Sequence, residues 1–406
     1  MTEHDSAPDT IQRYAGYPRS ERQRRLLALA APLAERFAAR ALAHDADASF
    51  PLENIADLRE SGLLALTVPE TYGGLGANEL EHTLVIERLA WGDASTALAL
   101  GMHLSNIGQM AEGGLWPERF PALCREIVED GAMLNAAQAE PELGSPSHGG
   151  VPATTAQPDP AGDWRITGRK IYTTGAPALR YFLVLAALDE PGEPVRLGSF
   201  LVPSDALGLR IEKTWDAMAL RASGSDDLVL EDARVGADAL LDVRPVGAPD
   251  PRAALGLPWG ALTLGAIYTG VALAARDEAV HFAATRIPTA LGKPIGELPT
   301  VRQKLGEIEA LLLASHRLLY GLAADWVETP ELRPVLRAQG GLVKSITTNN
   351  AVRVTDLALR ITGGAGLQRE PMRLERLFRD ARAGLINAPP DDTTLQNAGR
   401  AAVEGR

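Results

Sequence analysis

Few residues in this sequence form a motif whose spacing alone indicates a particular chemistry. The chain has no G-x-x-x-x-G-K-S/T phosphate loop, no H-E-x-x-H, no C-x-x-C and no G-x-S-x-G motif. The single cysteine, Cys124, excludes an internal disulfide and a zinc site built on cysteines, and we expect it to be a small buried residue on a helix. The glycine clusters at 73–76 and 363–366 lack the G-x-G-x-x-G spacing, which favours a turn and a helix cap.

Length and composition indicate a globular protein of two or three domains. The 406 residues are 46% apolar, 23% charged and only 5% aromatic, so Ala and Leu must fill much of the interior. The 40 basic and 52 acidic residues give a net charge of −12, which argues against a strong non-specific hold on nucleic acid or an anionic membrane. With no signal-peptide layout and no expected apolar stretch of membrane-spanning length, we predict a soluble, cytoplasmic protein.

Hydrophobic periodicity divides the chain into helical, β and helical parts. After a flexible N-terminus at 1–18, apolar residues at helical spacing predict an α-helical domain over 19–131, including a helix with Leu26, Leu29, Leu33 and Phe37 on its buried face. Residues 132–246 contain short β-branched runs between turns, typical of a sandwich or barrel. The expected strands are 151–155, 164–167, 170–174, 181–185, 199–202, 209–213 and 227–230. Residues 247–406 return to long helices, which predicts an α+β protein.

Six segments in the same order resemble the acyl-CoA dehydrogenase superfamily. They are Val68–Asn78, Ala139–Ser145, Ile166–Gly175, Trp215–Val235, Gly363–Gly366 and Leu377–Asp380. The resemblance covers about residues 20–400 and implies an N-terminal helical domain, a middle β domain and a C-terminal four-helix bundle. Because one fold supports several reactions, it does not fix the chemistry.

The resemblance implies a flavin, FAD in most members, between the β domain and the C-terminal helices. Tyr172 matches the aromatic residue that lies against the flavin ring, and Thr174 matches a hydroxyl donor near its reactive nitrogen. The other matching positions are Gln138, Ala139 and Ser145 near the ring edge and pyrophosphate, Arg286 reaching the pyrophosphate across a subunit boundary, and Arg360 and Gly364 at the last phosphate-proximal turn. A homotetramer, or at least a dimer, is implied in the same way.

The residues that remove the substrate α-proton in family dehydrogenases are missing. Ala388 stands where most members have a catalytic Glu, and Gly260 stands where a minority have it. Ala261 replaces a frequent Arg that contacts the substrate, and Pro299 replaces a Gln. Removal of the substrate α-proton requires a carboxylate in a dry pocket. The missing Glu residues therefore raise the question of which reaction this chain catalyses.

Three hypotheses follow from these departures. In the first, an acyl-CoA or related activated substrate is oxidised with Asp391 or Asp392 as a displaced base, although this pair also suits a helix N-cap. In the second, the chain resembles two-component flavin monooxygenases such as dibenzothiophene monooxygenase, with FMN as the alternative flavin and a reductase partner. The segment 170–176 and His103, which matches a catalytic histidine of that branch, favour the second, although Asn387 replaces its second histidine. In the third, the protein is a non-catalytic flavin-binding or scaffold homologue.

Overall fold

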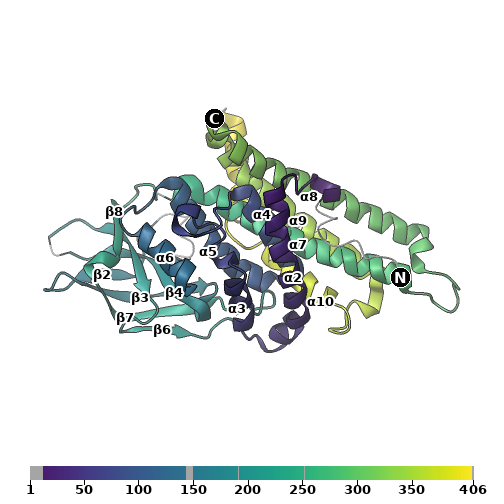
Figure 1. Ribbon diagram of the computed structural model, residues 1–406, viewed down its shortest axis with the longest axis horizontal. Helices are drawn as coiled ribbons and strands as arrows, with labels where there is room; N and C mark the ends of the chain where they lie inside the picture. The colour runs from purple at the N-terminus through teal and green to yellow at the C-terminus, as the bar shows by residue number, and fades with distance from the viewer. Residues whose placement is uncertain (1–11, 143–149, 191, 251, 405–406) are drawn as a thin grey trace.

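The computed structural model describes residues 12–142, 150–190, 192–250 and 252–404. Helices come first, then a sheet, then long helices, as Figure 1 shows, so the α+β prediction is confirmed. The N-terminal helices are α2 (Glu21–Asp47), α3 (Leu52–Glu60), α4 (Glu79–Gly92), α5 (Ala94–Gly113) and α6 (Phe120–Asp130). The C-terminal helices are α7 (Ala253–Thr285), α8 (Pro299–Glu328), α9 (Arg333–Thr362), α10 (Leu374–Ala383) and α11 (Asp391–Glu404).

Helices α2, α4 and α5 begin at polar caps, and the N-terminal helices differ in how far they are buried. Ser20 caps α2 and Asn78 caps α4, each in a capping box that satisfies the first free backbone N–H groups. The buried face of α2 includes Leu26, Leu33 and Phe37, but Leu29 is 39% exposed, so that part of the predicted stripe is wrong. Helix α4 is enclosed on every side, because 13 of its 14 residues are buried.

The middle of the chain forms one sheet at one end of the molecule (Figure 1). Its strands are β1 (Met133–Ala137), β2 (Thr155–Pro158), β3 (Trp164–Thr173), β4 (Leu179–Leu188), β5 (Arg196–Pro203), β6 (Leu209–Glu212), β7 (Asp226–Val235) and β8 (Leu240–Pro245). They follow the order β6-β7-β3-β2-β4-β5-β8, and β1 pairs in parallel with β4. Helix α6 packs Phe120, Leu123 and buried Cys124 against the β1–β4–β5 part of the sheet.

The sheet corrects three sequence expectations. The separate strands predicted at 164–167 and 170–174 are one continuous strand, β3. The predicted strand at 151–155 reaches a strand only at Thr155, and β1 and β8 were not predicted.

Helix α7 is the central helix of the C-terminal part. Its Pro258–Thr285 section is long and apolar enough to cross a membrane, contrary to the sequence expectation, but 94% of its most apolar window is buried, so it serves as a core helix. At Gly270 the helix approaches the α4 backbone so closely that a Cβ atom would lie 2.5 Å from the Glu87 carbonyl oxygen.

A buried polar cluster connects α4 to α8. Glu87 Oε1 lies 2.8 Å from His316 Nε2, and Tyr320 donates to Glu87 Oε2 at 2.6 Å. His316 Nδ1 lies 2.8 Å from the Leu312 carbonyl, so both ring nitrogens face acceptors. Burial opposes the charged form, but the charge and hydrogen bond of Glu87 outweigh it and raise the pKa of His316. An imidazolium–carboxylate pair therefore joins the two helical parts.

Candidate functional site

The segments that carry the predicted flavin contacts are held together by a buried ion pair. Lys170 Nζ on β3 lies 2.6 Å from Glu140 Oε1, which follows β1. Glu140 also accepts from Thr154 Oγ1 at 2.6 Å, and the Ile171 backbone N–H donates to the Ala139 carbonyl at 2.9 Å. Burial alone would raise the pKa of Glu140, but the hydrogen bonds and charge of these partners lower it. Ala139 is therefore fixed beside the end of β3.

Tyr172 is exposed and conformationally strained at the end of β3. Its side chain is 64% exposed, and its φ of 58° lies in the left-handed region that non-glycine residues rarely adopt. The Tyr172 ring meets Trp215 edge to face, with ring centroids 6.1 Å apart. Such strain persists where surrounding structure imposes it, and it is common at ligand sites.

Thr174 lies next to a chain of buried hydroxyl groups. Its Oγ1 is 3.0 Å from Ser225 Oγ, which is 2.7 Å from Ser223 Oγ. The Thr174 carbonyl accepts from Asn135 Nδ2 at 3.0 Å, which links β1 to the same turn. The hydroxyl group predicted to face the flavin is thus held by Ser225, while Asn135 fixes the Thr174 backbone.

Gln138 lies at the end of β1, facing the start of α7. With its amide turned so that both polar atoms meet suitable partners, the Gln138 oxygen accepts from Arg252 Nη1 at 3.2 Å. Asp250 accepts from Arg252 Nη2 at 2.9 Å. Ser145, the other predicted residue of this segment, lies outside the described residues.

Arg379 and Asp380, the Arg-Asp pair of the C-terminal motif, hold the loop that carries Ser223 and Ser225. Arg379 Nη2 lies 2.6 Å from Asp45 Oδ2 on α2, and Arg379 Nη1 donates to the Met218 carbonyl at 2.8 Å. Asp380 Oδ1 accepts from the Leu220 N–H at 2.7 Å, and burial raises the pKa of this carboxyl to about 6. The pair is a structural connection between α2, α10 and the segment leading to Ser223.

Neither position of the family base carries a carboxylate, and the structure defines what surrounds each. Ala388 is exposed in the connection between α10 and α11. Buried Lys344 on α9 holds this connection by donating to the carbonyls of Asn387 at 2.9 Å and Pro389 at 3.1 Å, and Tyr268 donates to Asn387 Oδ1. At Gly260 on α7, no heavy atom lies within 4 Å of the place that a Cβ would take.

Asp391 and Asp392 are the first two residues of α11, just inside the N-cap that the alternative predicted for them. Asp391 Oδ2 accepts from Asn349 Nδ2 at 2.6 Å, and its Oδ1 lies 3.8 Å from Lys344 Nζ. Asp392 is exposed. Asp391 therefore belongs to the group of residues around Lys344 that fixes the loop.

His103 on α5 is buried in the protein core, and both of its ring nitrogens have hydrogen-bond partners. Nε2 is 3.0 Å from the Leu64 carbonyl, and Nδ1 accepts from the Leu134 N–H at 3.1 Å. Burial lowers the pKa of His103 to about 4. This geometry favours the core-histidine interpretation over the catalytic one.

The remaining predicted residues are exposed and lie on other segments. Arg286 is the C-cap residue just after α7, and Figure 1 shows the α7–α8 connection at the end of the molecule away from the sheet. Arg360 pairs with Asp356 at 2.8 Å, and Gly364 is in the short turn after α9. Across the described parts of the chain, no group of three or more His, Cys, Asp and Glu side chains could hold a metal.

Comparison with known proteins identifies the family. Models of the acyl-CoA dehydrogenase N-terminal, middle and C-terminal domains match residues 20–114, 135–233 and 262–388. The chain is 41% identical over 385 residues to the Bacillus subtilis (strain 168) protein "Putative acyl-CoA dehydrogenase YdbM", which covers 95% of this chain and 98% of the relative. The chain therefore belongs to the acyl-CoA dehydrogenase family, a family of flavin-dependent oxidoreductases.

Proteins named for other activities are also similar to this chain. Amino sugar nitrososynthase DnmZ of Streptomyces peucetius is 32% identical over 378 residues, covering 90% of each chain. The crystal structure of TdsC from Paenibacillus sp. A11-2 with FMN and indole matches with a TM-score of 0.84 and 25% identity, covering 94% of this chain and 98% of that one. The family thus includes proteins similar to this chain whose names describe different reactions.

Sequence reasoning missed the buried charges that hold this site in place. Glu140, Lys170 and Lys344 lie in motifs or helices whose apolar pattern gives no indication of a partner. A charged residue in an otherwise buried run was the available signal, because such residues are rarely buried unless paired.

Proposed function

We propose that this chain is a flavin-dependent monooxygenase that inserts one atom of O2 into a small organic substrate. The observation that carries the proposal is the missing base: Ala388 and Gly260 occupy both family positions. Dehydrogenation at a carbon next to a carbonyl needs a positioned carboxylate to take the proton, whereas oxygen insertion does not. At Gly260 no neighbouring side chain fills the place that a catalytic Glu would take.

The residues around Tyr172 fit a planar flavin ring. An exposed aromatic side chain on a strained backbone offers a flat apolar face, and Thr174, two residues later, carries a hydroxyl that is 3.0 Å from Ser225 Oγ. Gln138 and the Ala139 backbone would bind the polar ring edge. A bound reduced flavin would supply the two electrons with which one oxygen atom of O2 enters the substrate and the other leaves as water.

FMN and a reductase partner suit this proposal better than FAD alone. The support is the TdsC complex, which contains FMN, and the similarity to a nitrososynthase. Arg286, Arg360 and Gly364 would reach the flavin of a neighbouring copy, which makes a homo-oligomer, a tetramer in our prediction, part of the proposal. Their exposure and the position of the α7–α8 connection support this.

A second candidate is oxidation of an acyl-CoA with Asp391 as the base. The similarity to the Bacillus subtilis relative and the partly exposed Asp391 beside Lys344 favour it. The two candidates differ in what Asp391 does: a base is required for each turnover, whereas a residue that only fixes the loop can be replaced by an isosteric amide.

The test uses the full-length protein with two substrates. With chemically reduced FMN and ¹⁸O₂, we expect one labelled oxygen atom in the product of indole, measured by mass spectrometry. With butyryl-CoA under anaerobic conditions, we expect no bleaching of the bound flavin. Bleaching by butyryl-CoA that is lost in Asp391→Asn and kept in Asp392→Asn would replace our proposal with the second candidate. Failure to bind FMN and FAD would leave only a scaffold.

A further inference from the structure

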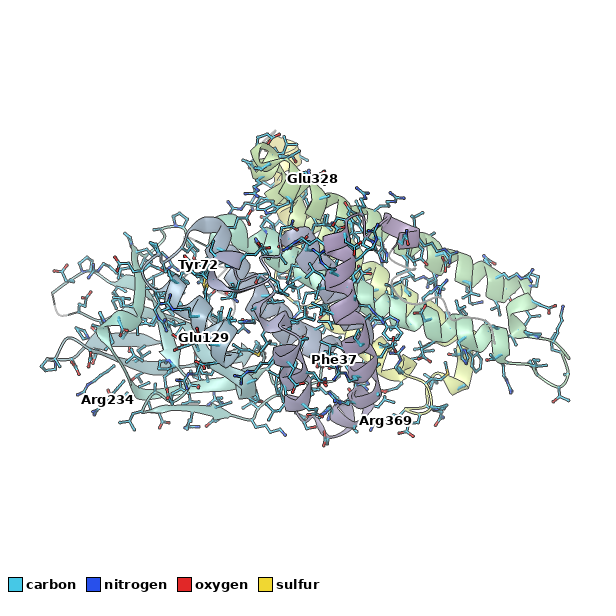
Figure 2. The ribbon with its side chains drawn as sticks, viewed as in Figure 1. Phe37, Tyr72, Glu129, Arg234, Glu328 and Arg369 are labelled. Atoms are coloured by element: carbon cyan, nitrogen blue, oxygen red, sulfur yellow. The ribbon has the colours of Figure 1, made fainter. Side chains whose placement is uncertain are left out.

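The first described residues of the chain, 12–19, lie against α8. Figure 1 shows this segment, in dark purple, beside α8, and Figure 2 labels Glu328 at the end of that helix. Tyr14 and Tyr17 are buried in the contact, each with only 3% of the residue exposed. We call residues 12–19 the N-terminal strap.

Four aromatic rings form a row between the strap and α8. The ring of Tyr14 lies on the ring of His316, with centroids 5.0 Å apart. His316 stacks on Tyr320 at 6.0 Å, and Tyr320 stacks on Tyr17 at 5.3 Å. The two α8 rings are therefore each in contact with one ring of the strap.

The row includes one half of the buried ion pair between α4 and α8. His316 Nε2 lies 2.8 Å from Glu87 Oε1, and the side chains of both residues are 0% exposed with the strap in place. Tyr320 donates its hydroxyl to the same carboxylate at 2.6 Å. Because Tyr14 lies directly on the His316 ring, the strap is part of the cover that keeps water from this pair.

The other ionisable groups around the row keep their charge between pH 6 and pH 9. Tyr14 donates its hydroxyl to Glu309 at 2.7 Å, and Glu309 pairs with Arg276 at 2.9 Å. Burial raises the pKa of all three tyrosines of the row, so they stay neutral in this range. The remaining charged residues beside the rings are arginines and carboxylates: Arg13, Arg19, Arg317, Asp325 and Glu328. Among the described residues around the row, His316 is therefore the group that titrates.

We propose that the positive charge of His316 holds the N-terminal strap on α8, and that loss of the His316 proton releases the strap. An imidazolium is attracted to the electron-rich face of Tyr14, and a neutral imidazole lacks this attraction. Loss of the proton also leaves Glu87 as a buried carboxylate without a counter-charge, which is unfavourable until water reaches it. An open strap admits that water. The proposal does not depend on the flavin chemistry.

The direction of the pH dependence follows from the ion pair. Burial lowers the pKa of His316, but the charge and hydrogen bond of Glu87 outweigh it and raise this pKa above 6.5. The contribution of the charged His316 to strap attachment is therefore complete below pH 6.5 and is lost as the pH rises above that value.

The experiment measures strap opening in the full-length protein by limited proteolysis with trypsin at pH 6 and pH 9. Trypsin should cut after Arg13 only in the open strap, because Tyr14 is buried in the closed one. A synthetic peptide of residues 8–20 in the same tube is the reference, and the ratio of the two cleavage rates removes the pH dependence of trypsin itself. We expect this ratio to rise by about fivefold or more from pH 6 to pH 9.

Mass spectrometry identifies the product, which should lack only residues 1–13 or 1–19. An unchanged or falling ratio would overturn the proposal. Cleavage throughout the chain with the same pH dependence would also overturn it, because the opening would then be global unfolding.

Three variants assign the effect to the contact between Tyr14 and His316. His316→Gln has no titratable ring, so its ratio should be high already at pH 6 and should not change with pH. Tyr14→Leu removes the strap ring, leaves the Glu87–His316 pair intact and should also raise the ratio at pH 6. Tyr14→Phe is the matched control: it loses the hydrogen bond to Glu309 but keeps the ring, so the rise with pH should remain.

The variants can contradict the proposal separately. A full rise with pH in His316→Gln, or loss of the rise in Tyr14→Phe, shows that another group controls the strap. If His316→Gln does not fold, Tyr14→Leu decides, and a ratio as low as that of the wild type at pH 6 would contradict the proposed contact.

Discussion

Lys170 Nζ and Glu140 Oε1 lie 2.6 Å apart, and both side chains are at most 1% exposed. This contact joins the segment just after β1, which contains Ala139, to the end of β3, which contains Tyr172. A buried pair of this kind is weak evidence for stability in itself, because desolvation offsets the attraction. Removing one partner should destabilise the fold, because it leaves the other charge buried and unpaired.

The first prediction concerns this pair. Lys170→Met should lower the free energy of unfolding by about 3–5 kcal/mol, because Glu140 is left as an uncompensated buried charge. Urea unfolding followed by circular dichroism measures the loss. In the double variant Lys170→Met, Glu140→Gln, part of it should return. If the losses of the two single variants simply add, the two groups are not energetically coupled.

The second prediction concerns Asp380, whose pKa is raised to about 6 by burial. A carboxyl with a raised pKa in the folded state contributes stability below its unfolded pKa, near 4, and loses that contribution as pH rises through about 6. Asp380→Asn keeps an oxygen for the Leu220 N–H and has no charge to bury. As the pH is raised from 5 to 7, we expect the melting temperature of the variant to rise relative to that of the wild type, in buffers of about 0.15 M ionic strength. A constant difference across that range would contradict this.

The third prediction concerns His103, whose pKa burial lowers to about 4. Its contribution is present above the unfolded pKa, near 6.5, and is lost as pH falls towards 4. His103→Leu leaves the Leu134 N–H and the Leu64 carbonyl unpartnered, which costs about 1–3 kcal/mol for each group. We expect the variant to be less stable at pH 7.5 and less sensitive to acid between pH 6.5 and pH 4, as measured by urea unfolding. Full stability with lost turnover would instead support a catalytic His103.

The fourth prediction compares two glycines of α7. Gly260→Ala should raise the free energy of unfolding by about 0.5–1 kcal/mol, because the Cβ meets open space and alanine is the better helix former. Gly270→Ala should lower it by about 1–3 kcal/mol, because the Cβ would lie 2.5 Å from the Glu87 carbonyl. Thermal unfolding of both variants in one buffer gives the comparison, and the same sign for both would contradict the structure.

The fifth prediction concerns Lys344. Lys344→Met removes the donors that hold the carbonyls of Asn387 and Pro389, so the connection between α10 and α11 should open more often. Hydrogen exchange over 385–391 should be faster, and flavin affinity should fall by about tenfold if this loop borders the ring. Arg353→Met, an exposed α9 residue paired with Glu307, is the control and should change neither measurement.

The order of helices and strands was predictable because its signal is local. Apolar spacing identifies α8 and α9 without any knowledge of their partners. β1, Met133–Ala137, was missed because Met, Leu, Asn and Ala have little intrinsic preference for strands; its pairing with β4 makes it one. β3 was divided at Gly168, which lies against Thr154 so closely that only glycine fits.

The site was predictable only as far as the family resemblance extends. Tyr172, Thr174, Gln138 and Ala139 were chosen by position, and the structure gathers their segments around one ion pair. The contact between Tyr14 and His316 was not found, because packing between residues so far apart in the chain leaves no trace in local spacing. Whether His103 is free or engaged likewise depends on Leu64 and Leu134, which lie about 30 or more residues away in the chain.

The enclosure of α4 limits how this protein can be divided. A helix with almost no solvent face cannot be stable without the helices that cover it, and one of those is α7, more than 160 residues later in the chain. The N-terminal third, expressed as a fragment, would expose the faces of α4 that the C-terminal helices cover, including buried apolar and charged residues, and should aggregate. Although three domain models match separate stretches of the sequence, we expect the two helical regions to melt as a single cooperative unit.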